Sequence, residues 1–374
     1  MCSYRNPSPP REEEEPFLLG DAIGDTVYSK RWVLSVVADL CKYAHARCAT
    51  TERLPADCDV IDETDMDEEW EQELCKLWDA SVDEDVSCFL YEVNATDVAL
   101  QVIAVTQLPR LREICVGVLG NMACCLSVRI QLCQRSDFLS VIREVLMCGD
   151  PPTLIEAVRL IRTCVCDENC RVPWLTTFRE SEFQNSLLFI LESSTNENLL
   201  TSVAQLVDDA VRTDSDLASV IAGPRCMQAI CEAFGQVRQS EPSRCDVFLL
   251  LMQALSSTEQ GIQSLVEVWA SAWSLVCAHI CACVSTDIHS AVNDQILSTA
   301  AACSLLSILI ENNRSEALEA LETLQDAPAV SIVTALEQLQ RLSHESDLEE
   351  EVEDEALQTF RQILNDVVNK VQRC

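Results

Sequence analysis

LPRLREICVGVLGNMACC, residues 108–125, is the stretch that decides the fold of this chain. Its apolar residues follow the spacing i, i+3, i+4, i+7, i+8 and i+11, which places them on one face of an α-helix. These residues are Leu111, Ile114, Cys115, Val118, Leu119 and Met122. Pro109 stands where a helix can begin, because proline fits the first helical position. The stretch therefore predicts a helix that buries one face.

Helices of the same type recur along the chain. The LGNMA ending of the quoted stretch resembles the third helix of an armadillo repeat. Helices expected at 83–94 and 96–106 complete a three-helix unit of about 45 residues. We therefore predict an all-α, armadillo- or HEAT-like solenoid. Further third helices are expected at 153–166, 198–211, 245–255 and 294–310.

The pattern divides the chain into four segments. Residues 1–24 are rich in proline and glutamate and lack an apolar period, which predicts a disordered acidic arm. Residues 25–80 are expected to form N-terminal capping helices with an acidic loop. Residues 83–342 are expected to hold the armadillo-like repeats. Residues 343–374 are expected to form an acidic loop and a C-terminal capping helix, because a solenoid needs an end with a polar face.

Composition agrees with an all-α chain and limits its partners. Of 374 residues, 48% are hydrophobic and only eight are glycine, while 61 acidic and 26 basic side chains give a net charge of −35. Such a surface repels nucleic-acid phosphates and anionic lipids. We expect no nucleic acid and no membrane, and a protein partner with a basic or amphipathic segment. Uncharged runs at 268–286 and 295–310 are interpreted as buried helices, since no basic loop flanks them.

The 22 cysteines are interpreted as packing thiols in a reducing compartment. The first residues are polar and contain no apolar signal region, which favours the cytosol or nucleus. Two groups could hold a metal by residue type. However, residues two apart on a helix point in nearly opposite directions, so we expect no metal and no cofactor. These groups are Cys164, Cys166 and Cys170, and Cys277, His279, Cys281 and Cys283.

Motifs of catalysis are absent from the sequence. It contains no GxSxG, HExxH, GxGxxG or GxxxxGK[ST] pattern, so we expect a non-enzymatic protein. Ser8 lies in the proline-directed context NPSPP, while Thr64 and Ser81 precede acidic residues that suit an acidophilic kinase. These three residues are weak candidate phosphosites.

Asn121 is the sharpest single candidate for partner binding. In armadillo proteins that hold extended peptides, an asparagine at this point of the third helix binds the peptide backbone. By this resemblance Asn121 could do the same, with Arg110 and Arg112 at the start of the helix. The alternative is that Asn121 satisfies a neighbouring loop. Gly117 stands where such a groove carries tryptophan, and no asparagine ladder follows, which slightly favours the alternative.

Five segments resemble one family. They are GDAIGDTVYSKRW (20–32), WDASVDEDVSCFL (78–90), LPRLREICVGVLGNMACC (108–125), DPPTLIEAVRLI (150–161) and SSTNENLL (193–200). They are similar to the serum amyloid A-like proteins, which are not the small secreted apolipoproteins. The resemblance implies an armadillo-like fold and a nuclear or nucleo-cytoplasmic location. It also implies a non-enzymatic role that promotes cell proliferation, notably of synovial fibroblasts, under pro-inflammatory stimuli.

The sequence therefore favours a protein-interaction solenoid. Two alternatives stay open. The dense cysteines are compatible with a metal or redox sensor. The strong negative charge is compatible with an acidic chaperone for basic proteins, whose binding would fall steeply with salt.

Overall fold

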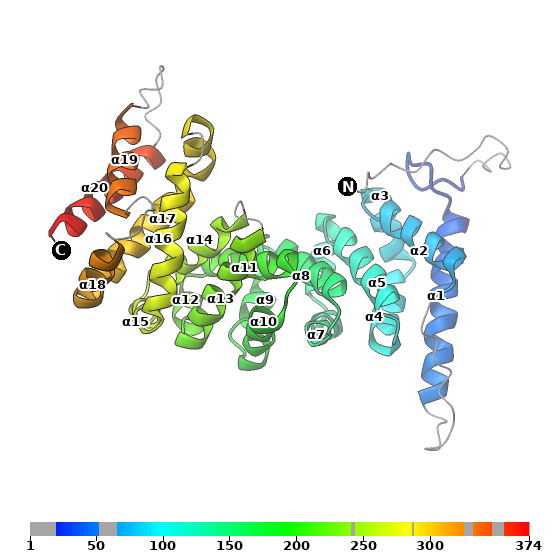
Figure 1. The fold of residues 1–374 in the computed structure, drawn as a ribbon. Helices are drawn as coiled ribbons and strands as arrows, with labels where there is room; N and C mark the ends of the chain where they lie inside the picture. Colours follow the sequence, from blue (N-terminus) through cyan, green and yellow to red (C-terminus); the bar gives the residue numbers. More distant parts are fainter. Residues whose placement is uncertain are drawn as a thin grey trace. The chain divides into compact units, whose positions relative to one another are not determined.

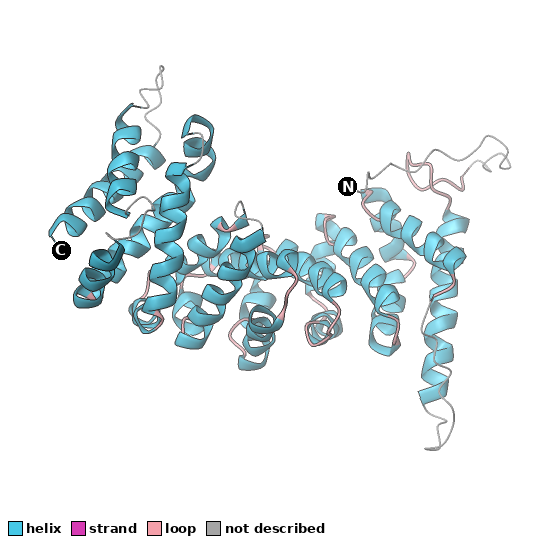
Figure 2. Cartoon of the chain, viewed as in Figure 1, coloured by secondary structure: helices cyan, strands magenta, loops and turns pink. Residues whose placement is uncertain are grey.

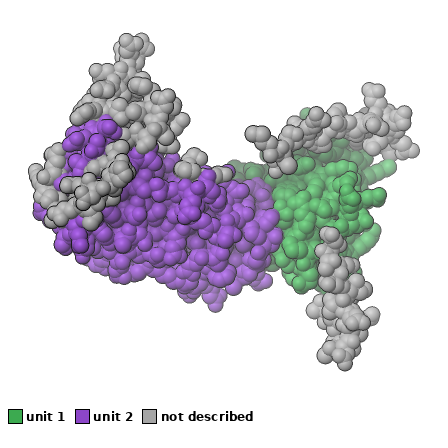
Figure 3. Space-filling model, in the orientation of Figure 1, with its two compact units in different colours: residues 1–141 green, residues 142–374 purple. Residues whose placement is uncertain are grey.

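A computed structural model describes residues 20–51, 66–240, 244–285, 288–324, 332–345 and 355–373. Within these ranges the chain forms twenty α-helices and no β-strand (Figures 1 and 2). Ala22 and Ser29 form an isolated antiparallel bridge. The prediction of an all-α, solenoid-like fold is confirmed. The chain divides into two compact units, Met1–Val141 and Ile142–Cys374 (Figure 3).

The first unit is built around α5, the helix of the deciding stretch. Pro109 begins α5 as predicted, and Leu111, Leu119 and Met122 are fully buried. Each buried side chain of this size stabilises the fold by about 2 kcal/mol. Around α5 pack α2, α3 and α4, and α1 packs on α4. The helices are α1 (Lys30–Thr51), α2 (Glu68–Ala80), α3 (Glu84–Glu92), α4 (Ala95–Val105), α5 (Pro109–Met122), α6 (Leu126–Cys133) and α7 (Ser136–Val145), which crosses the unit boundary.

A hydrogen-bonded turn precedes α1. The Ile23 amide donates to the Tyr28 carbonyl (3.0 Å) and the Lys30 amide donates to the Asp21 carbonyl (2.7 Å). Ile23 is buried. Residues 20–24, which the sequence assigned to the acidic arm, thus belong to this turn, whereas residues 1–19 of that arm lie outside the described residues.

The second unit repeats one three-helix plan. One row of neighbouring helices runs α8, α11, α14, α17, α20, and a second row runs α10, α13, α16, α19. Helices α9, α12, α15 and α18 connect the two rows, and the predicted third helices correspond to α8, α11, α14 and α17. The bounds are α8 (Pro151–Val165), α9 (Arg171–Thr177), α10 (Ser181–Ser193), α11 (Glu197–Thr213), α12 (Asp216–Ile221), α13 (Pro224–Ser240), α14 (Asp246–Leu255), α15 (Glu259–Glu267), α16 (Trp269–Ser285), α17 (Ile288–Asn312), α18 (Arg314–Leu324), α19 (Ile332–Glu345) and α20 (Glu355–Arg373).

The two uncharged runs form α16 and α17, which pack on each other. Val276 and Ile280 in α16 are fully buried, as are Leu305 and Leu309 in α17. Among the described helices, none alone is long and apolar enough to span a membrane, although three sharply bent helix pairs pass that test by length and composition.

The C-terminal helix α20 packs on both α17 and α19. Leu364 and Val367 of α20 are fully buried. The helix predicted as a cap therefore also occupies the third-helix place of the last repeat. The acidic residues 346–354 before it, and 52–65 near the start of the chain, lie outside the described residues.

Candidate partner-binding site

Asn121 lies at a junction of helices in the first unit. Its side-chain Nδ2 donates to the Trp78 carbonyl (2.9 Å) and to the Ser81 hydroxyl (3.1 Å), both at the C-terminal end of α2. Carbonyls of the last helical turn lack partners within their own helix, so the amide supplies one. Asn121 is 9% exposed. These contacts are of the kind expected from the alternative interpretation, in which Asn121 satisfies a neighbouring segment of its own chain rather than a bound peptide. Peptide binding by Asn121 stays a prediction, and would require the amide to leave these acceptors.

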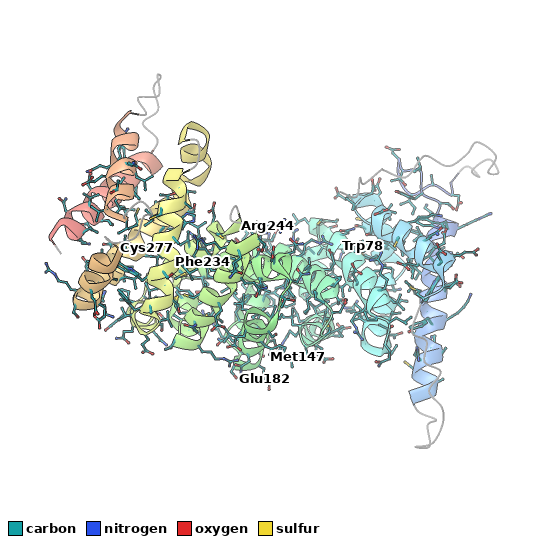
Figure 4. The ribbon with its side chains drawn as sticks, viewed as in Figure 1. Trp78, Met147, Glu182, Phe234, Arg244 and Cys277 are labelled. Atoms are coloured by element: carbon teal, nitrogen blue, oxygen red, sulfur yellow. The ribbon has the colours of Figure 1, made fainter. Side chains whose placement is uncertain are left out.

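The indole of Trp78 fills the space beside Gly117. A Cβ atom at residue 117 would lie 2.2–2.4 Å from three ring atoms of Trp78. Figure 4 shows Trp78 among the helices of the first unit. The tryptophan that the armadillo pattern would place on α5 is therefore replaced by one from α2. Gly117 is required here because only a residue without Cβ admits the ring.

Arg110 and Arg112 bind groups of their own unit. The Arg110 Nε lies 2.8 Å from Glu71 and its Nη1 lies 2.7 Å from Glu113, while its guanidinium carbon is 5.8 Å from the Trp78 ring centroid. Despite partial burial, these carboxylates raise the pKa of Arg110. Arg112 Nη2 donates to the Thr106 carbonyl. A role of either arginine in partner binding stays a prediction.

The candidate phosphosite Ser81 is inaccessible in the folded chain. It is fully buried, and its hydroxyl donates to the Trp78 carbonyl (2.6 Å). A kinase needs the hydroxyl free and exposed, so phosphorylation of Ser81 would require this part of the chain to open, and it stays a prediction. The sequence signal was only the acidic stretch after it, which instead supplies the Asp83 cap of α3. Ser8 and Thr64 lie outside the described residues.

An open cleft lies along the solvent-accessible side of α8, beside Ser202 of α11, in the second unit. Its volume is about 410 Å³. Along α8 its lining residues recur every three or four positions, so they share one helix face. We call it the α8–α11 cleft. Its lining residues are Ile155, Val158, Arg159, Arg162, Thr163, Cys166 and Ser202.

The charges of the α8–α11 cleft are paired. Arg159 Nη2 lies 2.6 Å from Glu156 on the same helix, and Arg162 bridges to Asp209 of α11. Behind them Arg212 Nε lies 2.8 Å from Asp208. Burial raises the pKa of Asp208 although Arg212 opposes this. The cleft thus offers guanidinium donors beside apolar surface, with little net charge.

The α8–α11 cleft was not predicted from the sequence. The position in α8 equivalent to Asn121 falls near Cys164, which is buried. The usable signal was the spacing of Arg159, Arg162 and Cys166, which places these polar residues on one side of α8 and its C-cap. Such a spacing predicts that this side of α8 is accessible to solvent. The cleft itself also needs the neighbouring helix α11, which a local pattern cannot predict.

The cysteine groups do not converge on a metal site. Within the described ranges, no three His, Cys, Asp or Glu side chains are placed to hold a metal ion. Burial raises the pKa of the Cys115, Cys226 and Cys303 thiols to about 12, which keeps them protonated and suits apolar packing. Burial also lowers the pKa of His279 to about 4, so this imidazole is neutral at pH 7.

Comparison with known proteins gives a consistent family. The model of the SAAL1 C-terminal domain matches residues 183–374. Protein saal1 of Danio rerio is 36% identical over 326 residues, which cover 82% of this chain and 68% of that protein. Protein SAAL1 of Homo sapiens is 33% identical over 351 residues, which cover 86% of this chain and 72% of that protein.

A solved structure was also found. It is an engineered protein, 10% identical, that covers 83% of this chain and 97% of its own with a TM-score of 0.25. That score is too low to support any argument from the likeness.

The family expected from the five quoted segments was wrong. The matching family model and the relatives are of SAAL1 proteins and not of a serum amyloid A-like family, and the two names only resemble each other. The prediction of helical repeats does not depend on that family, because it also follows from the spacing of apolar residues.

Proposed function

Because this chain belongs to the SAAL1 family, we propose that it is a non-enzymatic solenoid that binds a protein partner along the solvent-accessible side of α8, beside α11. The observation that carries the proposal is the α8–α11 cleft, where Arg159 and Arg162 lie beside Ile155 and Val158. A face of this composition suits an amphipathic segment, whose apolar side chains contact the aliphatic residues and whose polar groups reach the guanidinium groups.

The ion pairs of the cleft can be exchanged for a partner at low cost. Arg159 and Glu156 are three residues apart on one helix and partly buried, and helix pairs at this spacing contribute about 0.2–0.5 kcal/mol. A carbonyl or carboxylate of the partner can therefore replace Glu156 with little loss. Arg162 bridges two helices, so its replacement would also loosen the contact with Asp209.

The net charge of −35 supports a basic or amphipathic partner and opposes nucleic acid and anionic membranes. Charges far from the cleft act mainly on the association rate of the partner, because exposed charges are screened beyond about 10 Å at 0.1 M salt. Within the cleft, hydrogen bonds and apolar contact supply the selectivity.

Site-specific photocrosslinking tests the proposal. A photoreactive amino acid replaces Thr163 in the cleft or, as the matched control, Thr176 in α9. Both hydroxyls donate to the carbonyl four residues earlier, at 2.9 Å. We expect a discrete protein product from residue 163 alone, and its loss in the Arg159→Glu variant. Equal products from both positions would contradict binding at the cleft.

Two charge-reversal controls separate the cleft from general electrostatics. Arg179 and Arg225 are exposed arginines paired with Asp214 and Glu192 elsewhere in the second unit. Reversing both changes the net charge as much as reversing Arg159 and Arg162. If both double variants leave crosslinking at residue 163 equal or stronger, with a steep loss in salt, the protein acts as an acidic chaperone and not through the cleft, because added negative charge strengthens the attraction of a basic client.

The cellular setting is also part of the proposal. We expect the protein in the nucleus, the cytoplasm or both, where it promotes cell proliferation in response to pro-inflammatory stimuli. Cells that lack the protein should proliferate less after such a stimulus, and the intact chain should restore growth. The variant with Arg159 and Arg162 reversed should fail to restore it, whereas the Arg179 and Arg225 control should succeed.

A further inference from the structure

Two thiols from different helices lie in contact within the first unit. The Sγ atoms of Cys88 in α3 and Cys125, the residue before α6, are 3.8 Å apart, although 37 positions separate them along the chain. The hydroxyl of Ser127 lies 3.2 Å from the Cys125 Sγ. Since a disulfide bond measures about 2.05 Å, the two sulfurs have to approach by less than about 2 Å.

The surroundings of Cys125 favour its thiolate. Burial of this residue opposes ionisation, but hydrogen bonds from the Ser127 hydroxyl and from the amides of Val128 and Ser127 outweigh it and hold the pKa of the thiol below its usual value. Burial raises the pKa of Cys88. Within the pair, Cys125 is therefore the better nucleophile toward an oxidant at neutral pH.

Exposure sets which oxidant can enter. Cys88 is half-buried and Cys125 is 7% exposed. A small molecule such as hydrogen peroxide can reach the pair, whereas a protein oxidoreductase would first have to open the helices. Fully buried cysteines such as Cys115 differ, because the pKa of that thiol rises to about 12.

We propose that Cys88 and Cys125 are a redox modification site that hydrogen peroxide converts into a disulfide. The Cys125 thiolate attacks one oxygen of the peroxide, the O–O bond breaks, and the leaving hydroxide takes a proton to become water. The Cys88 sulfur, after losing its proton, attacks the Cys125 sulfenic acid and expels a second water. Two thiols and one peroxide thus give one disulfide and two waters, and the two electrons from sulfur reduce the peroxide.

The bond would join α3 to the turn between α5 and α6. The Asn121 junction lies at the C-terminal end of the same α5, so oxidation would restrict opening of this part of the first unit. The site does not depend on the proposed partner binding, because the α8–α11 cleft belongs to the second unit.

Peptide mapping of the full chain tests the proposal. The reduced protein is treated with hydrogen peroxide, alkylated, digested with trypsin and analysed by mass spectrometry. Peptide 77–110 carries Cys88 as its single cysteine, and peptide 113–129 carries Cys115, Cys124 and Cys125. We expect these peptides to be linked, and dithiothreitol to release them. Absence of the linked pair would overturn the proposal.

Three serine variants identify the partner of Cys88. Cys124 is exposed and adjacent to Cys125, with its Sγ 3.5 Å from the Gly120 carbonyl, and it serves as the matched control. The Cys124→Ser variant should keep the link, whereas Cys88→Ser and Cys125→Ser should lose it. A link that persists in Cys125→Ser, or disappears in Cys124→Ser, would contradict the assignment.

Thermal unfolding gives an independent readout. Oxidation should raise the melting temperature of the intact chain and of Cys124→Ser, because a crosslink restricts the unfolded state. It should leave Cys88→Ser unchanged. Circular dichroism of each reduced variant controls for folding. If Cys125→Ser does not fold, Cys88→Ser still decides the outcome, since Cys88 is less buried and its replacement disturbs less.

Discussion

Replacing Gly117 by alanine should have opposite effects on stability with and without the indole of Trp78. In the native chain the new Cβ would lie 2.2 Å from the ring of Trp78, so the indole has to move. Overpacking of this kind costs about 1–3 kcal/mol. The shift also weakens the contact of the ring with Arg110, a cation–π interaction of about 0.5–1 kcal/mol at an exposed site.

Alanine also has a favourable effect, which sets the expected balance. In a helix interior, alanine is about 1 kcal/mol more favourable than glycine. Gly117→Ala should therefore destabilise the native chain by about 0.5–3 kcal/mol, the sum of these three terms. In the Trp78→Ala background the ring is absent, so the same substitution should stabilise by about 1 kcal/mol. The difference between the two changes in the free energy of unfolding measures the interaction between residue 117 and the indole of Trp78.

Urea unfolding followed by circular dichroism supplies the four free energies of this cycle. Gly235→Ala in α13 is the matched control, because a Cβ there meets only a Leu275 methyl at 3.8 Å, an ordinary contact. It should stabilise the chain in either background. If Gly117→Ala is stabilising even with Trp78 present, the indole does not occupy the space that the structure assigns to it.

Three further predictions concern the turn before α1, a buried histidine and a buried serine. Gly24→Ala should destabilise the chain by about 1–3 kcal/mol, because residue 24 has φ +52° and a Cβ there would lie 1.9 Å from Asp85. Gly20 also has a positive φ, +106°, but a Cβ there meets no atom within 4 Å, so Gly20→Ala tests the backbone strain without the clash in the same urea assay. Burial lowers the pKa of His279 to about 4, so the unfolded chain takes up the proton first as pH falls below 6.5. The free energy of unfolding should then drop by about 1.4 kcal/mol per pH unit from pH 6.5 toward pH 4. Urea unfolding at several pH values should show this drop in the native chain, and the contribution of His279 to it should be absent in His279→Gln. Casein kinase 2, an acidophilic kinase, should leave Ser81 unmodified in the folded chain and modify it in an unfolded peptide. Rapid phosphorylation of Ser81 itself in the folded chain would contradict the burial of this residue.

The helices were predictable because their signal is local. The apolar spacing in 108–125 places α5 within a few residues of its observed bounds, and Pro109 fixes its start. The same reasoning located α8, α11, α14 and α17. It did not find the turn at 20–29, because residues 20–24 were grouped with an acidic arm on composition alone.

The partners of the candidate residues were not predictable. Asn121 bonds to Trp78 and Ser81, 43 and 40 positions away, and Cys88 meets Cys125 across 37 positions. No local spacing encodes such pairs. For Asn121 the sequence offered a neighbouring loop as the alternative to a bound peptide, but it could not name Trp78 and Ser81 as the acceptors.

The amino-acid order by itself determined that this chain is a series of amphipathic helices in three-helix repeats, because burying one apolar face constrains residues only three or four positions apart. Only the tertiary structure shows which side chains of different helices meet: Trp78 over Gly117, Cys88 beside Cys125, and Arg162 across to Asp209. The physical reason is that stacking sets the distance between helices through the packed volume of both partners, and that volume is a property of the pair and not of either sequence segment.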